Sequence, residues 1–402
     1  MKVEARLDRV PLRFYTDPDT YRQEQERIFG GPSWSYVGLG AEVPEAGDFK
    51  VTWVGDRQVV LVRDDEGDLW VWPNRCAHRG TALCREPFGH AEEFVCPYHQ
   101  WVYDLRGTLI GVPFRRGVKG QGGMPEDFCM EANGLPSLAV AERNGVVFAS
   151  FDDAAPNLNE YLGDAMLPYF DRVFGKDGLV VLGYERQRIP ANWKLLFENI
   201  KDPYHATLLH AFLVTFGLFR ADQPSETRMD STGRHSVLVS RRGEQAEAET
   251  VGEMRSFRDG FRLYDQRLLD IVREFPGEAT VVMQTLWPNL IVQQQSNTLA
   301  TRQIIPRAPG VSDLVWTFFG YVGDDDEMRM RRLRQANLMG PGGFVSIDDS
   351  EVMRLAQQAI EANPDGEALV EMGGRDTADA EHMATEAAIR AFYRYYREVM
   401  GL

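Results

Sequence analysis

Two short segments that each pair a cysteine with a histidine constrain this chain more than any other feature of its sequence. The first is Cys76-x-His78 within NRCAHRG, and the second is Cys96-x-x-His99 within CPYHQW. The chain has only four cysteines and seven histidines in 402 residues, so two such pairs in order are poorly explained by ordinary burial. Together they predict a metal site with four ligands.

The order of these four residues separates two kinds of metal site. Zinc accepts two thiolates and two imidazoles, but zinc fingers usually run Cys, Cys, His, His with wider spacing between the histidines. In a [2Fe–2S] centre of mixed ligation, two cysteines bind one iron and two histidines bind the other. Two loops that each offer one cysteine and one histidine fit that centre better. A zinc-stabilised protein with no redox role stays open as an alternative.

The pattern C-x-H-R-G, fifteen residues, then C-x-x-H resembles that of Rieske iron–sulfur domains. The resemblance implies that Cys76 and Cys96 bind one iron of a [2Fe–2S] cluster, and that His78 and His99 bind the other. It also implies a cluster potential suited to accepting electrons from a ferredoxin or reductase. The two remaining cysteines are expected to be packed thiols: Cys84 and Cys129.

A second set of candidate metal ligands lies in FENIKDPYHATLLH. Asn199, Asp202 and His205 are spaced by three and would share one face of a helix. His205 and His210 are five residues apart and would diverge by about 140° on a regular helix. They converge only where the backbone is irregular, and Pro203 favours such a break. A surface helix end with two unrelated histidines is the other interpretation.

The order E-N-x-x-D-x-Y-H-x4-H is similar to the iron-binding segment of Rieske aromatic-ring-hydroxylating oxygenase large subunits, and this resemblance covers nearly the whole chain. It implies a mononuclear Fe(II) held by His205, His210 and one carboxylate, with open positions for O2. Asp348 and Asp349 precede an expected helix in which Glu351 is placed for a capping box. The resemblance assigns the iron ligand to Asp349, which leaves Asp348 as the expected cap.

The same resemblance implies catalytic roles for Asp202 and Asn199. Asp202 would bond His205 in its own chain and His99 in a neighbouring chain, because carboxylates commonly orient metal-bound histidines. Electron transfer between subunits implies a homotrimer, or an α3β3 assembly with a small β subunit. The expected electron donors are a ferredoxin and/or a reductase, with NAD(P)H acting indirectly through the reductase.

The segments NIKDPYHATLLHAFLVTFGLFRADQ and NTLATRQIIPR look most like the salicylate 5-hydroxylase, anthranilate dioxygenase and terephthalate dioxygenase group. The implied substrate is a small aromatic carboxylate, and arginine is a suitable partner for such an anion in an apolar pocket. Arg302 and then Arg390 are the candidates, with a structural arginine as the alternative for each. Neither segment separates mono- from dioxygenation. Four residues are expected to line the pocket, unless they only pack in the core: Phe212, Val214, Phe216 and Phe219.

The pattern along the chain predicts an α+β protein of two domains. Short β-rich runs between turn signals over 35–152 predict an antiparallel Rieske [2Fe-2S] domain, with a Gly-rich surface loop over 115–128. Residues 1–34 and 153–402 are assigned to the mononuclear non-haem iron domain. The resemblance implies that its antiparallel sheet is covered by helices in a helix-grip, START-like arrangement.

Within the second domain, the sequence predicts several elements. Strand-like runs are expected between residues 279 and 322, and closing helices over 350–363 and 381–400. A helical pattern also covers 19–29 near the N-terminus. The polar stretch 221–253 is expected to be exposed, as a lid would be.

Charge and hydropathy exclude several classes of function. A formal net charge of −16 disfavours nucleic acid and anionic membranes as partners, because the summed field repels both. No apolar run reaches the length of a membrane helix, the N-terminus lacks a signal-peptide centre, and a cytoplasmic protein is expected. A Rieske electron carrier without an oxygenase site remains an alternative, as does an oxygenase acting on a neutral aromatic. Of these classes of protein, only an oxygenase needs the second set of candidate metal ligands.

Overall fold

The computed structural model describes residues 6–176, 178–242 and 252–402 and divides the chain into two compact units. The smaller unit is continuous and covers 29–155, whereas the larger one joins 1–28 to 156–402. Among the described residues, no helix has the length and apolar character needed to cross a bilayer.

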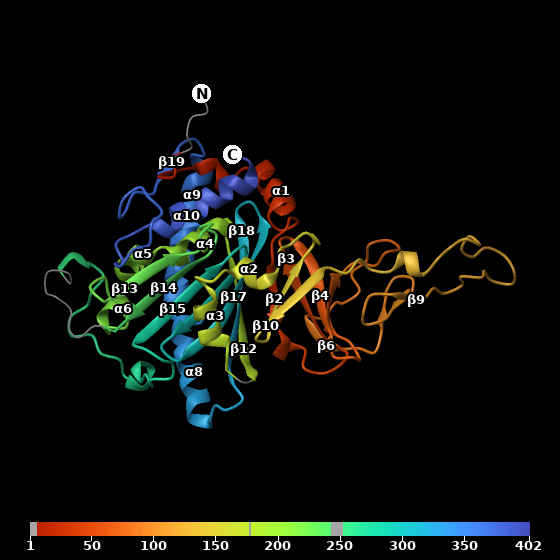
Figure 1. Ribbon diagram of the computed structural model, residues 1–402, viewed down its shortest axis with the longest axis horizontal. Coiled ribbons are helices and arrows are strands. Elements are labelled where there is room, and N and C mark those ends of the chain that lie inside the picture. Colours follow the sequence, from red (N-terminus) through yellow and green to blue (C-terminus); the bar gives the residue numbers. More distant parts are fainter. Residues whose placement is uncertain (1–5, 177, 243–251) are drawn as a thin grey trace. The chain divides into compact units, whose positions relative to one another are not determined.

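Three small antiparallel sheets build the smaller unit (Figure 1). Their strand orders are β10-β11-β2, β5-β4-β3-β6 and β7-β8-β9. The bounds are β2 Ser35–Leu39, β3 Asp48–Val54, β4 Arg57–Arg63, β5 Leu69–Pro73, β6 Phe88–His90, β7 Phe94–Val95, β8 Val102–Tyr103, β9 Leu109–Gly111, β10 Ala139–Arg143 and β11 Val146–Ser150. The β-rich runs of the sequence therefore form an antiparallel unit, as predicted.

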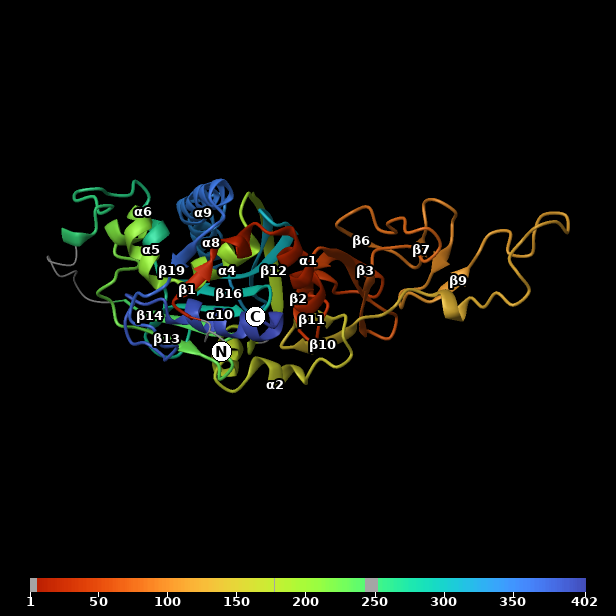
Figure 2. The same ribbon diagram turned by 90° about the horizontal axis from the view of Figure 1, so that it is seen from above.

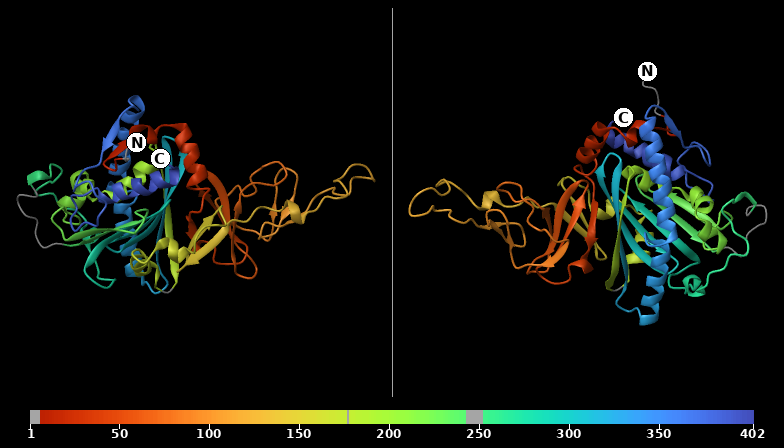
Figure 3. Two further views of the ribbon diagram at one scale, coloured as in Figure 1. Left: turned by 45° about the horizontal axis from the view of Figure 1, so that its top comes forward. Right: turned by 180° about the vertical axis from the view of Figure 1, so that it is seen from behind.

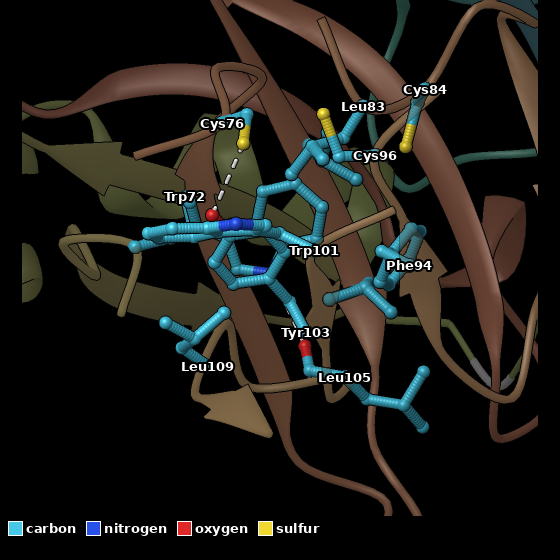
Figure 4. Packing of buried hydrophobic residues seen from close by; sticks show 13 residues of the cluster. Trp72, Cys76, Leu83, Cys84, Phe94, Cys96, Trp101, Tyr103, Leu105 and Leu109 are labelled. Carbon is cyan, nitrogen blue, oxygen red and sulfur yellow. Dashed lines mark hydrogen bonds between the residues drawn. The ribbon is translucent and has the colours of Figure 1, made fainter. Parts of the chain in front are cut away.

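The core of the smaller unit lies where the paired Cys/His loops begin. Figure 4 shows it as a cluster of rings and aliphatic side chains, centred on Trp72, Trp101 and Tyr103. Phe94 packs edge-on against Trp72, with 4.8 Å between ring centroids. Burial of this many aromatic side chains holds a unit with short strands together.

A seven-stranded antiparallel sheet forms the centre of the larger unit, in the order β12-β18-β17-β16-β15-β14-β13. Its strands are β12 Leu179–Ile189, β13 Ser225–Met229, β14 Ser236–Arg241, β15 Ala279–Leu286, β16 Leu290–Gln295, β17 Thr298–Ala308 and β18 Val311–Tyr321. A separate two-stranded pair joins β1 (Arg9–Pro11) to β19 (Glu367–Leu369). The strands predicted between residues 279 and 322 are confirmed.

Helices cover this sheet (Figure 1). α4 packs on β14, β15 and β17, while α10 packs on α4 and β13. Figure 3 shows α8 and α9 following one another along one side of the unit. The helices are α1 Pro18–Arg27, α2 Leu158–Leu162, α3 Leu167–Phe174, α4 Trp193–Lys201, α5 Pro203–Leu209, α6 Ala211–Thr215, α8 Asp326–Met339, α9 Phe344–Ala362 and α10 Ala387–Met400.

Two expectations for the larger unit are wrong. The polar stretch 221–253 contains β13 and β14, which extend the sheet to its edge, where a polar alternating strand is tolerated; its residues 243–251 lie outside the described residues. Helix α8 was not predicted, because its sequence lacks the apolar stripe that marks a helix. It packs instead through Arg332, whose buried guanidinium pairs with the carboxylates of Glu274 and Asp324.

Candidate metal centres

The two Cys/His loops of the smaller unit have the same backbone design. The N–H of Cys76 donates to the carbonyl five residues on, at Thr81, and its own carbonyl accepts from the N–H of Gly80. Cys96 makes the equivalent bonds with Trp101 and Gln100. Gly80 and Gln100 both have positive φ, +77° and +56°, so each loop turns back sharply at the same place.

This design places thiols inside and imidazoles outside. Cys76 and Cys96 are buried, whereas His78 is exposed and lies with its ring centroid 4.5 Å from that of His99. His78 also stacks on Trp101, with centroids 4.7 Å apart and an interplanar angle of 6°. Two thiols on one side and two imidazoles on the other are the donor set of a [2Fe–2S] centre of mixed ligation.

The environment of the thiols fits a bound cation. Burial raises the pKa of Cys76. A hydrogen bond of 3.3 Å between its Sγ and the Tyr103 hydroxyl, drawn in Figure 4, lowers that pKa but does not cancel the effect of burial. A thiolate here therefore needs a metal to stabilise it. Tyr103 was missed by the sequence analysis, because nothing in its local pattern marks it as a partner of Cys76.

The other two cysteines differ from each other. Burial raises the pKa of the Cys84 thiol to about 12, so it is the packed thiol that the sequence analysis expected. Cys129 is exposed, and its thiol donates to a carboxylate oxygen of Glu131 at 3.0 Å. The expectation of packing is wrong for Cys129, because it lies beyond the Gly-rich loop where few side chains can cover it.

In the larger unit, a broken helix brings the two histidines together. α4 ends at Lys201, Asp202 leaves helical geometry with φ −105° and ψ +91°, and α5 starts at Pro203. A second break at His210, with φ −86° and ψ +83°, separates α5 from α6. Asp202 caps α5, because its Oδ1 accepts from the N–H groups of Tyr204 and His205.

Three side chains converge at these breaks. Nε2 of His205 and Nε2 of His210 lie 3.3 Å and 3.1 Å from Oδ1 of Asp349, which comes from α9. One ligand atom from each of the three lies within 4.8 Å of the others. Two imidazoles and a carboxylate on one face are the donor set of non-haem Fe(II) sites with open positions. α5 and α6 lie beside α9 in Figure 2.

The outward-facing ring nitrogens also have carboxylate neighbours. Nδ1 of His205 lies 3.4 Å from Oδ2 of Asp202 without making a hydrogen bond. Nδ1 of His210 is hydrogen-bonded to Oδ2 of Asp348 at 3.4 Å. The capping role predicted for Asp348 is wrong, because α9 already begins at Phe344 with Gly343 as its N-cap.

The charges of the triad favour a cation at its centre. Burial lowers the pKa of His205, but the nearby carboxylates of Asp202 and Asp349 favour the charged imidazole, overcome this and raise the pKa to about 10. Burial would raise the pKa of Asp349, yet the two histidines hold it well below its usual range. A metal ion would take the place of the protons that satisfy this carboxylate.

Asn199 joins α4 to this triad. Its Nδ2 donates to Oδ1 of Asp349 at 3.0 Å and lies 3.2 Å from Nε2 of His205. The amide therefore fixes the carboxylate relative to the histidine, which is a positioning role.

A cavity of about 50 Å³ lies beside the triad. Arg302 lines it, is buried, and has its guanidinium 3.9 Å from the ring centroid of Trp316. Nε of Arg302 donates to Oε1 of Gln293 at 2.7 Å, and Nη2 donates to the same oxygen. Burial lowers the pKa of Arg302 to about 9, against the attraction of Asp349. Apolar side chains form most of the remaining wall: Leu213, Phe219, Leu238, Val281, Met283 and Val345.

The other residues predicted to bind substrate lie elsewhere, apart from Phe219, which lines this cavity. Arg390 is buried in α10, where its guanidinium donates to the carbonyls of Val370, Met372 and Asp376, and this placement gives it no contact with the cavity. Val214 is buried and is not part of the cavity wall. A separate pocket on the other side of α6 is lined by two further residues: Phe212 and Phe216.

Comparison with known proteins agrees with both centres. The family model for the ring hydroxylating alpha subunit (catalytic domain) matches residues 177–402, and that for the Rieske [2Fe-2S] domain matches residues 33–121. The large oxygenase component of salicylate 5-hydroxylase from a Ralstonia species is 52% identical, over 98% of this chain and 94% of the relative. The anthranilate 1,2-dioxygenase large subunit from Burkholderia cepacia is 44% identical, over 98% and 93%.

A solved structure has the same fold. Naphthalene 1,2-dioxygenase from a Rhodococcus species, bound to indole, aligns with a TM-score of 0.81 at 25% identity, over 98% of this chain and 94% of that one. The chain therefore belongs to the ring-hydroxylating oxygenase alpha subunits. More narrowly, it is an oxygenase large subunit with a Rieske [2Fe–2S] domain and a non-haem iron catalytic domain, for which O2 is the co-substrate and a reductase supplies electrons.

Proposed function

We propose that this subunit hydroxylates the ring of a small aromatic carboxylate. The observation that carries the proposal is Arg302, a buried cation on the wall of the cavity that also holds His205, His210 and Asp349. The substrates printed in the names of the two relatives, salicylate and anthranilate, are aromatic carboxylates of this class.

Burial makes Arg302 a strong partner for an anion. No carboxylate forms an ion pair with it in the described part of the chain, and stacking on Trp316 holds its plane fixed. An incoming carboxylate would give this desolvated cation a charge-assisted partner, and such pairs are strongest in water-poor surroundings. Gln293 occupies Nε and Nη2, so Nη1 remains for the ligand.

The second metal centre would be held by His205, His210 and Asp349 through the nitrogen and oxygen atoms that converge. When bound, iron there supplies the activation of O2. Asn199 keeps the Asp349 carboxylate in place, and the apolar wall excludes water from the ring. Arg302 anchors the carboxylate at one end of the cavity, which selects the part of the ring that faces the iron.

We propose the first centre in the same way, with Cys76 and Cys96 on one iron and His78 and His99 on the other. The thiols lie in the buried core, so the imidazoles, of which His78 is exposed, form the side from which electrons leave. Asp202 is proposed to connect His205 to His99 of a second copy of the chain, through its carboxylate.

Two exposed surfaces support contact between copies. Basic residues surround the Cys/His loops: Arg75, Arg79, Arg85, Arg115, Arg116 and Lys119. Acidic Asp348 and Glu351 lie among exposed apolar residues on the α5–α9 face: Tyr204, Leu208, Ile347 and Leu355. Exposed apolar residues such as these are typical of a surface that a partner covers. A homotrimer, or an α3β3 assembly, would repeat this contact in a closed ring.

Electrons are proposed to reach the cluster from a ferredoxin and/or reductase that uses NAD(P)H, in the cytoplasm.

Turnover of matched ligands tests the substrate class. We expect benzoate, salicylate and anthranilate to be oxidised by the purified subunit with its electron-transfer chain, with products identified by mass. Arg302→Met should weaken kcat/KM for these acids about tenfold or more while changing that for benzamide or phenol little. Arg302→Lys, which keeps the charge, should recover part of the loss. Equal losses for acids and neutral analogues would show that Arg302 is structural.

A further inference from the structure

A second pocket lies on the opposite side of α6 from the iron cavity. It has a volume of about 350 Å³ and is lined by residues of α6, the segment 258–264 and the start of α9. Its wall is unusually aromatic, with rings from Phe212, Phe216, Phe261, Tyr264 and Phe344. Phe212 and Phe344 stack at 5.8 Å with an interplanar angle of 8°.

Two arginines complete the wall, Arg258 and Arg262, and both are exposed. In residues 6–176, 178–242 and 252–402, neither forms an ion pair with a carboxylate. The Arg258 side chain donates through Nη1 to the carbonyls of Arg255 and Phe257, and its backbone N–H donates to Oγ1 of Thr215. Two available guanidinium groups stand out on a chain whose net charge is −16.

The outer pocket and the iron cavity share two helices as walls. In α6, Leu213 lines the iron cavity and the adjacent Phe212 lines the outer pocket. At the start of α9, Val345 lines the iron cavity and Phe344 lines the outer pocket. Consecutive residues of α6 and of α9 thus line the two pockets.

We propose that the outer pocket binds an aromatic carboxylate, as a staging site for the substrate of the iron cavity. The ring would pack among the phenyl groups, and the carboxylate would bind Arg258 and Arg262. The exposure of Phe261 (67%) and Tyr264 (106%) is typical of an apolar surface that a ligand covers. This inference rests on the proposed function, because the ligand class is that of the inner site.

Binding stoichiometry separates the two sites. Carbon-14 benzoate in equilibrium dialysis against the holoenzyme should show two sites per chain. The paired substitutions Arg258→Gln and Arg262→Gln should leave one site, weakening the outer affinity about tenfold or more. Arg255→Gln is the matched control, since Arg255 is an exposed arginine three residues before Arg258 that does not line the pocket. Arg302→Met should also leave one site, the outer one.

Other numbers of benzoate sites would distinguish the staging site from the site at Arg302. One site per chain that Arg302→Met removes and the paired variant keeps would overturn the staging site and leave the proposed function standing. A site lost only in the paired variant would support the staging site and contradict the role of Arg302. If the paired variant changes the oligomeric state on size exclusion and keeps the benzoate count, the pocket is a contact between copies and the proposal is wrong. Phe261→Ala, at an exposed position, provides a second test that leaves the core intact.

Discussion

Each histidine of the triad has one ring nitrogen directed at the metal position and the other at a carboxylate. For His205 the outer carboxylate is Asp202, and for His210 it is Asp348. A carboxylate behind an imidazole fixes the tautomer that leaves Nε2 free, and it makes that nitrogen a better donor. The two acids thus differ from Asp349, which faces both Nε2 atoms directly.

Asp348→Asn should therefore weaken iron binding at the second centre. The amide cannot accept the Nδ1–H of His210 as strongly as a carboxylate, so we expect a loss of about 10- to 100-fold in metal affinity. Titration with a chelator, followed by iron analysis, measures it, and the cluster spectrum should stay unchanged. Glu351→Gln, one turn along α9 and paired with Arg354, is the control. Unchanged iron affinity in Asp348→Asn would contradict this role.

Local spacing made most of the site residues visible in the sequence. The Cys/His pairs and the segment from Asn199 to His210 are short, so their residue types and distances along the chain carried the information. Asp349 lies 139 residues beyond His210, and it was selected only through resemblance. Three contacts were not predicted: Tyr103 with Cys76, Gln293 with Arg302, and Asp348 with His210. Contacts between distant segments leave no local pattern in the sequence.

At the scale of elements, the joint between α8 and α9 sets the position of Asp349. The turn contains Gly340, Gly342 and Gly343. A Cβ at Gly343 would lie 2.2 Å from the Leu338 carbonyl oxygen and 2.3 Å from that of Asn337, both in the backbone of α8. The start of α9 can only be this close to the end of α8 if the residue has no side chain.

Gly343→Ala should consequently displace α9 and the ligand that it carries. We expect a loss of about 1–3 kcal/mol in stability, together with reduced iron content. Thermal unfolding and iron analysis measure the two effects. Gly342→Ala is the matched control, because its Cβ would meet only the end of the Glu185 side chain at 3.0 Å. Equal behaviour of the two variants would show that α9 does not depend on this contact.

His235 connects three elements of the larger unit in its neutral form. Its Nδ1 accepts from the N–H of Trp287 at 3.0 Å, which leaves Nε2 to donate to the Tyr161 carbonyl at 2.9 Å. Burial lowers its pKa to about 3, with Arg234 acting in the same direction against the opposing charge of Asp230. Protonation of Nδ1 would remove the bond to Trp287.

Stability should therefore fall with acid through His235. An unfolded histidine has a pKa near 6.5, so between pH 6.5 and about 3 the unfolded state binds more protons than the folded one. Neutral His235 makes its full contribution to the free energy of unfolding above pH 6.5, and about 2 kcal/mol of that contribution is lost by pH 5. Burial raises the pKa of Glu198 to about 7, which acts in the opposite direction.

Other groups also titrate between pH 5 and 7.5, so the effect of His235 is measured by comparing the parent chain with variants. Guanidinium unfolding at pH 7.5 and 5.0 should show a flatter pH dependence in His235→Gln than in the parent chain. His90→Gln, at an exposed histidine, should keep the parent dependence. Identical slopes in the parent chain and His235→Gln would contradict the account.

Elements with a regular apolar pattern were predicted, and those built on polar contacts were not. β15 to β18 follow β-branched, buried runs, and the break near Pro203 was visible as a proline within a helical pattern. α8 and β13 have too few apolar residues to show a period. The start of α9 was predicted too late in the sequence. The turn before it is held by contact with the backbone of α8, and no capping side chain marks it.

For the whole molecule, the proposed route of electrons requires two copies. His78 on the imidazole side of the cluster is exposed, and the Asp202 side chain is 20% exposed. If the route crosses between copies, damage to one centre in one copy can be compensated by another copy. If it runs within a chain, such compensation cannot occur.

Mixing two inactive variants separates these routes. Asp202→Asn keeps the α5 cap, because asparagine is an equally good cap, but removes the bridging charge. Cys96→Ser should lose the cluster and keep the second iron. Equal amounts of the two, dissociated and reassembled, should recover about one quarter of parental turnover, since one interface in four pairs an intact cluster with an intact Asp202 in a closed assembly.

Several controls make this result interpretable. Each variant alone should be nearly inactive, the Asp202→Asn cluster should still be reduced by the electron donor, and iron content at the second centre should be normal in both. Mixing without dissociation should recover nothing, because exchange of copies is required. Reassembled mixtures that stay inactive, with assembly verified by size exclusion, would place the route within one chain and remove Asp202 as a bridge between copies. Recovery near one quarter can arise only where the cluster of one copy serves the iron of the next.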